Sequence, residues 1–363
     1  MRELDEPDLD DLAVGAAILG TGGGGNPYIG KLLARETIRD HGPVTVVEPS
    51  EVPDDALVVQ SAMMGAPTVM VEKIPSGEEL LRAFEALQGA LGREITHVVP
   101  AEIGGLNSMM PLIVAARTHL PLVDADGMGR AFPEVQMVTP TIYGISVTPM
   151  ALVDEKGNAA LIETIDNRWT ERFARALTVE MGCTALVAEC SMSGAELKET
   201  MVAGTLTLAQ ELGRLVRTAR ERHESPIDAV VQRLGGLVLF RGKLADVRRH
   251  TVAGFARGEA QIRGTGGDTG ATLTLRFQNE HLYAERDGEV LITAPDLIIV
   301  LDAETGEPIT TEDMRYGFRV VVIGAPCDLR WRTAGGLELV GPRCFGYDVD
   351  YVPVEQRAAG TRT

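Results

Sequence analysis

The residues best suited to chemistry gather in three glycine-containing segments of the N-terminal part of the chain. Residues 122–134, with the sequence LVDADGMGRAFPE, combine two aspartates, an arginine and a glutamate. Asp124 and Asp126 lie two residues apart, so their side chains share one face of an extended chain. Either is suited to act as a general base or to accept from a ring N–H, with Arg130 balancing the charge. The alternative is a structural loop in which an aspartate caps a turn and Arg130 forms an ion pair.

Four consecutive glycines mark the second segment, residues 21–27 (TGGGGNP). Glycines allow a ligand to approach the backbone closely, and the Asn26-Pro27 start signal places helical N–H groups beside them, which favour an anion or a carbonyl oxygen. No Gly-Lys-Ser/Thr follows, and a helix precedes, so neither a Walker loop nor a dinucleotide fingerprint is present. A flexible turn between helices is the alternative. The expected substrate contacts here are Gly22, Gly23, Gly24, Gly25 and Asn26.

The third segment, residues 100–108 (PAEIGGLNS), follows an expected strand and opens a helix. Glu102 stands at the carboxyl end of that strand and is a third candidate for the general base. Asn107 is a candidate donor to substrate, although a helix N-cap is the simpler role. The loop at residues 63–67 follows another strand and would reach the same rim. Ligands bind beyond the carboxyl ends of strands in open parallel sheets, so the convergence of these loops predicts the site.

Alternating helices and short apolar strands are expected to position these loops. Strands rich in Val and Ile without alternation are typical of strands buried on both faces, and helices between them indicate βαβ units. We therefore predict an α/β, three-layer N-terminal domain with a mainly parallel sheet, closed by a hairpin at residues 155–158. The expected helices are 8–19, 27–39, 76–91 and 107–118, and the expected strands are 44–47, 56–61, 95–99 and 122–123.

The second half of the chain has a different pattern. Long helices are expected at 169–181 and 196–224, and the chain becomes rich in β-strands from residue 237. Strand candidates are 272–277, 289–292, 297–301 and 318–323, with Asp-Gly and Thr-Gly turns between them. We predict a smaller α+β C-terminal domain rich in β-strands. The expected division is 1–165 for the first domain, 166–325 for the second, and 326–363 for a segment that returns to the first.

Composition and charge restrict the class of protein. The 363 residues suit two domains, and 45% hydrophobic residues exclude a disordered chain. Asp plus Glu total 52 against 34 Lys plus Arg, a net charge of −18, which disfavours nucleic acid and anionic membrane surfaces. Four isolated cysteines, an acidic N-terminus and the lack of a long apolar run predict a reduced, cytoplasmic protein. The histidines show no metal-ligand spacing, so no metal or cofactor is predicted.

The chemical segments resemble the S-methyl-thiohydantoin desulfurase-like family, whose members are often linked to hydantoinase and oxoprolinase proteins. The matching residues are 20–28 (GTGGGGNPY), 103–107 (IGGLN), 121–136 (PLVDADGMGRAFPEVQ), 331–333 (WRT) and 341–348 (GPRCFGYD). Together they span nearly the whole chain, and DGMGRAFPE is the most specific string. Many members of the family carry Asp where this chain has Asn26.

The resemblance implies an α/β domain followed by a smaller mixed domain, and work on hydantoin-like five-membered rings. The name-giving activity hydrolyses an S-methyl-thiohydantoin to methanethiol and hydantoin. Water addition needs a general base, for which the candidates are Asp124, Asp126 and Glu102. Charge developing on the ring needs donors. The candidate substrate-binding residues are the four loop glycines, Asn26, Asn107, Arg130 and Glu134.

Two other functions remain open from the sequence. Besides an enzyme that acts on a small ring substrate, the chain could be a non-catalytic partner or regulatory subunit of an ATP-dependent hydantoinase or oxoprolinase. The third alternative is a small-ligand sensor. A crevice with perturbed carboxyl groups favours the enzyme, whereas an exposed apolar patch away from it favours the partner hypothesis. The resemblance also implies a homo-oligomer.

Overall fold

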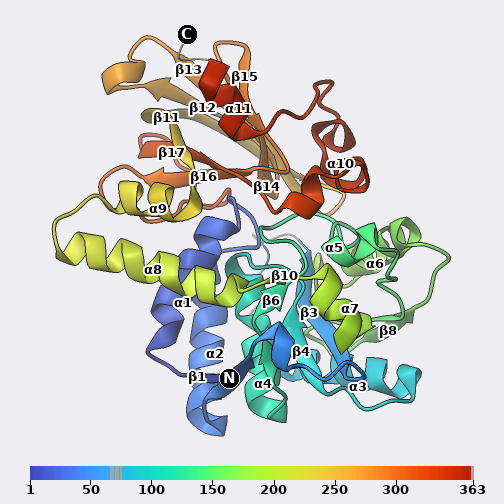
Figure 1. The fold of residues 1–363 in the computed structure, drawn as a ribbon. Coiled ribbons are helices and arrows are strands. Elements are labelled where there is room, and N and C mark those ends of the chain that lie inside the picture. Colours follow the sequence, from blue (N-terminus) through green and yellow to red (C-terminus); the bar gives the residue numbers. More distant parts are fainter. Residues whose placement is uncertain (66–68, 70–72, 74–75, 361–363) are drawn as a thin grey trace.

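Two β-sheets organise the chain in the computed structural model, which describes residues 1–360 apart from 66–68, 70–72, 74 and 75. Figure 1 shows the helix-flanked first sheet below and the second sheet above it, with α8 and α9 beside the junction. Ala66 and Pro67 of the expected rim loop lie outside the described residues. Within the described part, no helix has both the length and the apolar character needed to span a membrane.

The first sheet has the strand order β1-β2-β5-β4-β3-β9-β7-β8. Its centre, β2-β5-β4-β3, is parallel, and the flanking pairs are antiparallel. The strands are β1 (Arg2–Leu4), β2 (Val44–Val47), β3 (Leu57–Gly65), β4 (His97–Pro100), β5 (Leu122–Val123), β7 (Met150–Val153), β8 (Ala159–Ile162) and β9 (Thr184–Ser193). The predicted α/β domain with parallel strands is thus confirmed, and β7 and β8 form the predicted hairpin.

Helices cover both faces of this sheet. On β9, Leu186 and Ala188 join the core that contains α3, whereas Ala185 and Val187 join the core that contains α6, so these two helices lie on opposite faces. The helices are α1 (Asp8–Leu19), α2 (Pro27–His41), α3 (Glu78–Leu91), α4 (Met110–Thr118), α5 (Thr139–Ile142), α6 (Asn167–Glu180), α7 (Gly194–Thr200), α8 (Thr205–Glu221), α9 (Pro226–Leu234), α10 (Ala334–Val340) and α11 (Val354–Gly360).

The second sheet is antiparallel throughout and has the order β15-β14-β13-β12-β11-β17-β16. On β16, Leu297 and Ile299 belong to the core of the first sheet, whereas Ile298 and Val300 belong to a second core, so the sheets share apolar packing. Its strands are β11 (Leu237–Val252), β12 (Phe255–Gly264), β13 (Thr272–Gln278), β14 (Glu280–Arg286), β15 (Glu289–Thr293), β16 (Leu297–Asp302) and β17 (Arg319–Ala325).

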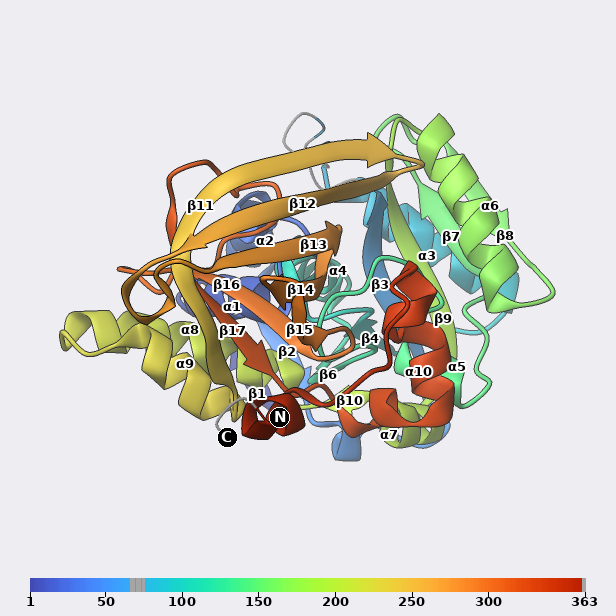
Figure 2. The ribbon, with the colours of Figure 1, turned by 90° about the horizontal axis from the view of Figure 1, so that it is seen from above.

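The long β11–β12 hairpin arches over the molecule towards α6 in Figure 2. Its tip contacts that helix, because Arg175 donates a hydrogen bond to the Gly254 carbonyl and stacks 4.1 Å from the centre of the Phe255 ring. The hairpin therefore links the second sheet to a helix of the first.

The chain crosses between the two sheets more often than the expected divisions at 165 and 325 imply. β9 lies in the first sheet, and β10 (Val202–Ala203) pairs with β6 (Ala125–Asp126). The single helix expected at 196–224 is two helices, because Met201 is extended and Gly204 adopts a left-handed conformation. In the C-terminal segment, the Trp331 indole donates to the Met128 carbonyl of the DADGMG loop.

Two glycines allow α1 and α8 to approach closely. A Cβ on Gly15 would collide with the Ala209 carbonyl oxygen, and one on Gly213 would collide with that of Asp11. Because both obstacles are backbone atoms, the helices would have to separate to accommodate a side chain.

We predict that Gly15→Ala lowers the free energy of unfolding by about 1–3 kcal/mol, because overpacking outweighs the gain in helix propensity. The matched control is Gly89→Ala in α3, where the added Cβ meets open space. That control should be neutral or stabilising by up to about 1 kcal/mol. Urea unfolding of both variants measures the difference, and equal stability of the two would contradict the packing argument.

Candidate functional site

A cavity lies where the ends of β3 and β4 meet the start of β14, and its space, including solvent at its open side, is about 570 Å³. Its walls come from both sheets and from the three glycine-containing segments, residues 21–27, 100–108 and 122–134. Apolar wall residues include Met63, Met64, Met128, Phe132 and Val187, and the polar ones include Glu102, Asn107, Glu134, Arg175, Glu189, Asn279 and Glu280.

Three carboxyl groups dominate the cavity. Glu102 follows β4, Glu189 lies on β9, and Glu280 begins β14, so three distant chain segments supply them. Their exposed fractions are only 3%, 2% and 2%. One oxygen of each, Oε2, is buried without a hydrogen-bond partner among the described residues. Each of these oxygens is left for a water molecule or a ligand to satisfy.

Burial and mutual repulsion set the protonation of this trio, which we call the carboxyl trio (Glu102, Glu189 and Glu280). Burial raises the pKa of Glu102 and of Glu189 to about 8, and it raises the pKa of Glu280 well above its usual range. Charge repulsion adds to the rise, from Glu171 and then Glu102 at Glu189, and from Glu102 at Glu280. Near pH 7 the trio therefore holds protons and offers both donors and acceptors, as acid–base catalysis requires.

Glu102 is held in place by Asn107. The Asn107 Nδ2 donates to Glu102 Oε1 at 2.5 Å, while its Oδ1 accepts from the Met63 amide at 2.6 Å. Asn107 thus ties the ends of β3 and β4 together, and this is the role of its side chain rather than the N-cap considered from the sequence. Glu102 Oε2 has no hydrogen-bond partner among the described residues.

The glycine segment is packed between the two sheets. Gly22, Gly24 and Gly25 have positive φ angles of 88°, 71° and 78°, which favour glycine. A Cβ on Gly23 would meet the Glu280 carboxyl group, and one on Gly24 the Gly104 backbone. The Gly24 backbone amide also lowers the pKa of Glu280. The loop therefore lets Glu280 enter the cavity, and only Gly24 of the four glycines lines it.

Asn26 takes part in structure outside the cavity. Its Oδ1 accepts from the Tyr28 amide and caps α2, as the Asn-Pro signal predicts, and its Nδ2 donates to Asp313 at 2.7 Å. The side chain is exposed. The helix N-terminus is thus occupied by its own cap.

Arg130 is fully buried and uses all five of its N–H donors within the protein. They reach the carbonyls of Ala131, His281, Pro295 and Asp296 and the Thr21 hydroxyl, at 2.7–3.1 Å. Burial lowers the pKa of Arg130 to about 10, so it remains charged near neutrality. The side chain joins the glycine segment to β14 and to the turn before β16, and it has no donor left for a substrate.

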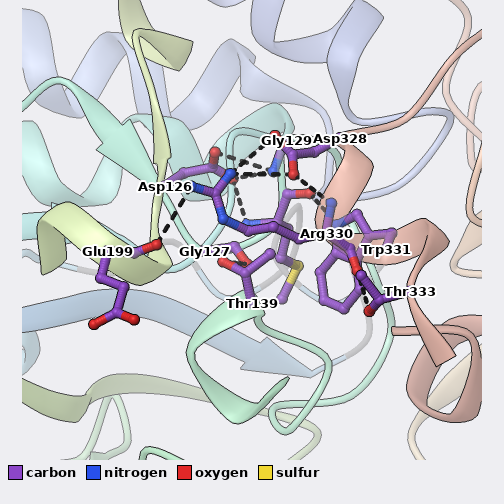
Figure 3. A network of polar contacts seen from close by, with 10 residues as sticks. Asp126, Gly127, Gly129, Thr139, Glu199, Asp328, Arg330, Trp331 and Thr333 are labelled. Carbon is purple, nitrogen blue, oxygen red and sulfur yellow. Dashed lines mark hydrogen bonds and ion pairs between the residues drawn. The ribbon is translucent and has the colours of Figure 1, made fainter. Parts of the chain in front are cut away.

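Asp126 organises the DGMG turn shown in Figure 3. Its carboxylate accepts from the Ile103, Met128 and Gly129 amides at 2.8–3.0 Å. Burial raises the pKa of Asp126 to about 7. Figure 3 also shows Trp331 and the Arg330–Asp328 pair of the C-terminal segment beside this turn. Asp126 therefore connects residues 122–134 to residues 100–108.

Asp124 holds the start of α8. Its Oδ1 accepts from the Leu206 and Thr207 amides at 2.9 and 3.1 Å, and its Oδ2 accepts from the Thr207 hydroxyl. A carboxylate at a helix N-terminus satisfies free amides and interacts well with the helix dipole. The structure therefore places this carboxylate away from the cavity.

Of the residues selected from the sequence, four line the cavity: Gly24, Glu102, Asn107 and Glu134. The other selected residues, Gly22, Gly23, Gly25, Asn26, Asp124, Asp126 and Arg130, surround it and fix its loops. Sequence reasoning missed Glu189 and Glu280. Glu189 had a usable signal, because it interrupts the apolar run TALVAEC of a buried strand. Within the described residues, no cluster of three His, Cys, Asp or Glu side chains is arranged to hold a metal ion.

Comparison with known families and structures agrees with the resemblance found in the sequence. Residues 7–164 match the S-Me-THD-like, N-terminal domain, and residues 165–354 match the S-Me-THD-like, C-terminal domain. A crystal structure of a protein from Chromobacterium violaceum is similar at 27% sequence identity, with a TM-score of 0.80. The alignment covers 98% of this chain and 100% of that chain. None of the curated proteins matches the sequence.

The raised pKa values predict that stability falls as pH rises. Between the ordinary carboxyl pKa of 4.5 and the folded value of about 8, the folded protein holds protons at Glu102 and Glu189 that the unfolded chain has released. The free energy of unfolding should therefore fall with pH across this window, by up to about 1.4 kcal/mol per pH unit for each group. Urea unfolding at pH 5.5, 6.5, 7.5 and 8.5 measures this slope.

The Glu189→Gln variant should have a shallower slope, since it removes one of the titrating groups. Glu180→Gln on the exposed face of α6 is the matched control and should keep the slope of the original chain. An unchanged slope in the Glu189→Gln variant would show that this carboxyl group does not titrate differently on folding.

Replacing Arg130 should destabilise the junction of the two sheets. Arg130→Met leaves four buried carbonyls and a hydroxyl without their donor, and we predict a loss of about 3–5 kcal/mol in urea unfolding. Arg214→Met on the exposed side of α8 is the control and should change stability by less than about 0.5 kcal/mol. A loss at Arg130 no larger than at Arg214 would refute the bridging role.

Proposed function

Because the chain belongs to the S-Me-THD-like family along residues 7–354, we propose that it is an enzyme that hydrolyses a hydantoin-like ring bearing an S-methyl group. The products would be methanethiol and the corresponding hydantoin. One observation carries the proposal: three buried glutamates, each with a carboxyl oxygen that has no hydrogen-bond partner among the described residues, line a single cavity with partly apolar walls.

The carboxyl trio supplies the acid and the base for this reaction. An ionised carboxylate takes a proton from a water molecule while the water oxygen bonds to the ring carbon that carries sulfur. A neutral carboxyl group of the trio protonates the ring nitrogen. The C–S bond then breaks with its electron pair on sulfur, and sulfur leaves as the thiol after taking the hydroxyl proton. One carboxyl group of the trio has gained a proton and another has lost one, so the total number of protons on the trio is unchanged. One water molecule is consumed for each methanethiol released.

Glu102 is the strongest candidate for the base. Asn107 donates to its Oε1 and thereby favours the ionised form, while Oε2 is left to face a water molecule. Neighbouring carboxyl groups that cannot all ionise divide into acid and base, which assigns the proton-donor role to Glu189 or Glu280.

The apolar wall suits the methylthio group. Met63, Met64 and Met128 line the cavity together with Phe132, and flexible thioether side chains pack well against sulfur and aromatic groups. This surface also keeps the medium around the carboxyl groups low in polarity, which strengthens their hydrogen bonds to the ring.

A second candidate function, a partner subunit for a hydantoinase or oxoprolinase, has one observation in its favour. Three large apolar side chains near α6 are exposed: Ile165 is 88% exposed, Trp169 is 39% exposed and Phe173 is 49% exposed. Exposed apolar side chains grouped in this way are typical of interaction surfaces. A partner subunit bound there would leave the cavity open to chemistry, so the two functions are compatible.

A thiol-release assay tests the enzyme. Chelator-dialysed protein is mixed with an S-methyl-thiohydantoin, a 2-thiohydantoin or a plain hydantoin, and free thiol is measured with a thiol reagent. We expect thiol only from the first substrate. The Glu102→Gln variant should lower kcat by about 10²–10⁴-fold, since general base catalysis contributes roughly that factor.

Two further variants locate the base. Asp124→Asn tests the assignment favoured by the sequence, and Glu180→Gln is the surface control. Thiol release that survives in Asp124→Asn and is lost in Glu102→Gln supports the carboxyl trio. The reverse result returns the base to Asp124, and no thiol from any ring with folded protein contradicts the enzyme proposal.

A further inference from the structure

Among the described residues, no cationic side chain donates a hydrogen bond to the carboxyl trio. Two arginines are near the cavity, and both are already used: Arg130 has five bonds to other groups, and Arg175 donates to Glu171 at 2.7 Å and to the Pro133 carbonyl at 3.0 Å. Arg175 is the only Lys or Arg among the described residues that line the cavity. The charge of Arg130 lowers the pKa of Glu102 and of Glu280, but among the described residues neither arginine donates a hydrogen bond to the trio.

The trio is also prepared to accept hydrogen bonds. Asn107 donates to Oε1 of Glu102, yet Oε2 of Glu102 and Oε2 of Glu280 have no partner among the described residues. Glu189 also has an unpartnered Oε2. When these buried carboxyl groups ionise they require several N–H donors close together, and charged donors form the strongest such bonds.

We propose that the cavity binds its ring in the protonated, cationic form, with the N–C–N group held by the unpaired oxygens of Glu102, Glu189 and Glu280. The kind of ring is taken from the proposed function, on which this inference rests, and the charge of the bound ring is what the inference adds. S-methylation turns a thiourea-like unit into an isothiourea, whose imine nitrogen has a lone pair that can take a proton. A carboxyl group of the trio transfers its proton to that nitrogen, which leaves a carboxylate paired with a planar cation that carries N–H donors.

This charge state explains selection of the S-methylated ring. A ring that keeps C=S or C=O between two N–H groups has no basic imine nitrogen and stays neutral in the cavity. The cation also places positive charge on the carbon that water must attack, so the contact that binds the ring activates it as well.

Two ring probes of nearly equal size test the proposal by binding alone, so the test does not require hydrolysis of a thiohydantoin. The cation is 2-methylthio-2-imidazoline, which is protonated at neutral pH, and the neutral analogue is 2-imidazolidinone. Isothermal titration on chelator-dialysed protein at pH 7 compares their dissociation constants. We expect the cation to bind at least about tenfold more tightly, a difference of roughly 1.4 kcal/mol.

Variants confirm which groups hold the charge. Glu189→Gln should weaken cation binding about tenfold and change binding of the neutral ring by less than about twofold, whereas Glu180→Gln should alter neither. Thermal unfolding checks that each variant is folded, and the comparison of the two probes on the original chain stands without any variant.

The outcomes separate this inference from the proposed function. Preferential binding of the cation supports the inference even if no thiol is released from any substrate. Equal binding of the two probes, or binding of the neutral ring alone, overturns it even if thiol release is observed. Failure of both probes to bind folded protein also overturns it.

Discussion

The buried guanidinium of Arg130 is the contact on which the arrangement at the cavity depends. Removing a full charge from water costs several kcal/mol, and only a complete set of hydrogen bonds offsets that cost. Arg130 obtains this set from four backbone carbonyls and Thr21, which belong to the glycine segment, the DGMGRA loop, β14 and the turn before β16. Since Glu280 stands next to the bonded His281, the arginine also fixes where the second sheet presents its carboxyl group.

The sequence predicted the elements well where local signals were strong. The helix over 8–19, the Asn26-Pro27 start and the strand over 44–47 match α1, α2 and β2, because periodicity, caps and apolar runs are local properties. The break between α7 and α8 was missed because one left-handed glycine, Gly204, interrupts an otherwise helical pattern. The placement of β9 in the first sheet was missed too, since strand pairing depends on contacts distant in the chain.

The candidate site was predicted in outline and not in its full chemistry. Convergence of loops at strand ends follows from parallel topology, and it brought Glu102, Asn107 and Gly24 to one cavity. The sequence could not distinguish a carboxylate that catalyses from one that holds backbone amides. Asp124 and Asp126 are rich in such amide contacts, and only coordinates show this. Glu280 had no local signal, because its position arises from the packing of the second sheet on the glycine segment.

The boundary between the two family regions runs through the cavity rather than beside it. Glu102 lies in the region that matches the N-terminal domain, whereas Glu189 and Glu280 lie in the region that matches the C-terminal domain. Strand β9 shows this most directly. It belongs to the second region, yet it forms part of the first sheet and carries Glu189. Burial of each carboxyl group, and hence its raised pKa, depends on the other region covering it. The chemistry of the trio is therefore a property of the packed pair of sheets, and a mutation that loosens their junction would let water reach the carboxyl groups and return their pKa values towards the ordinary range.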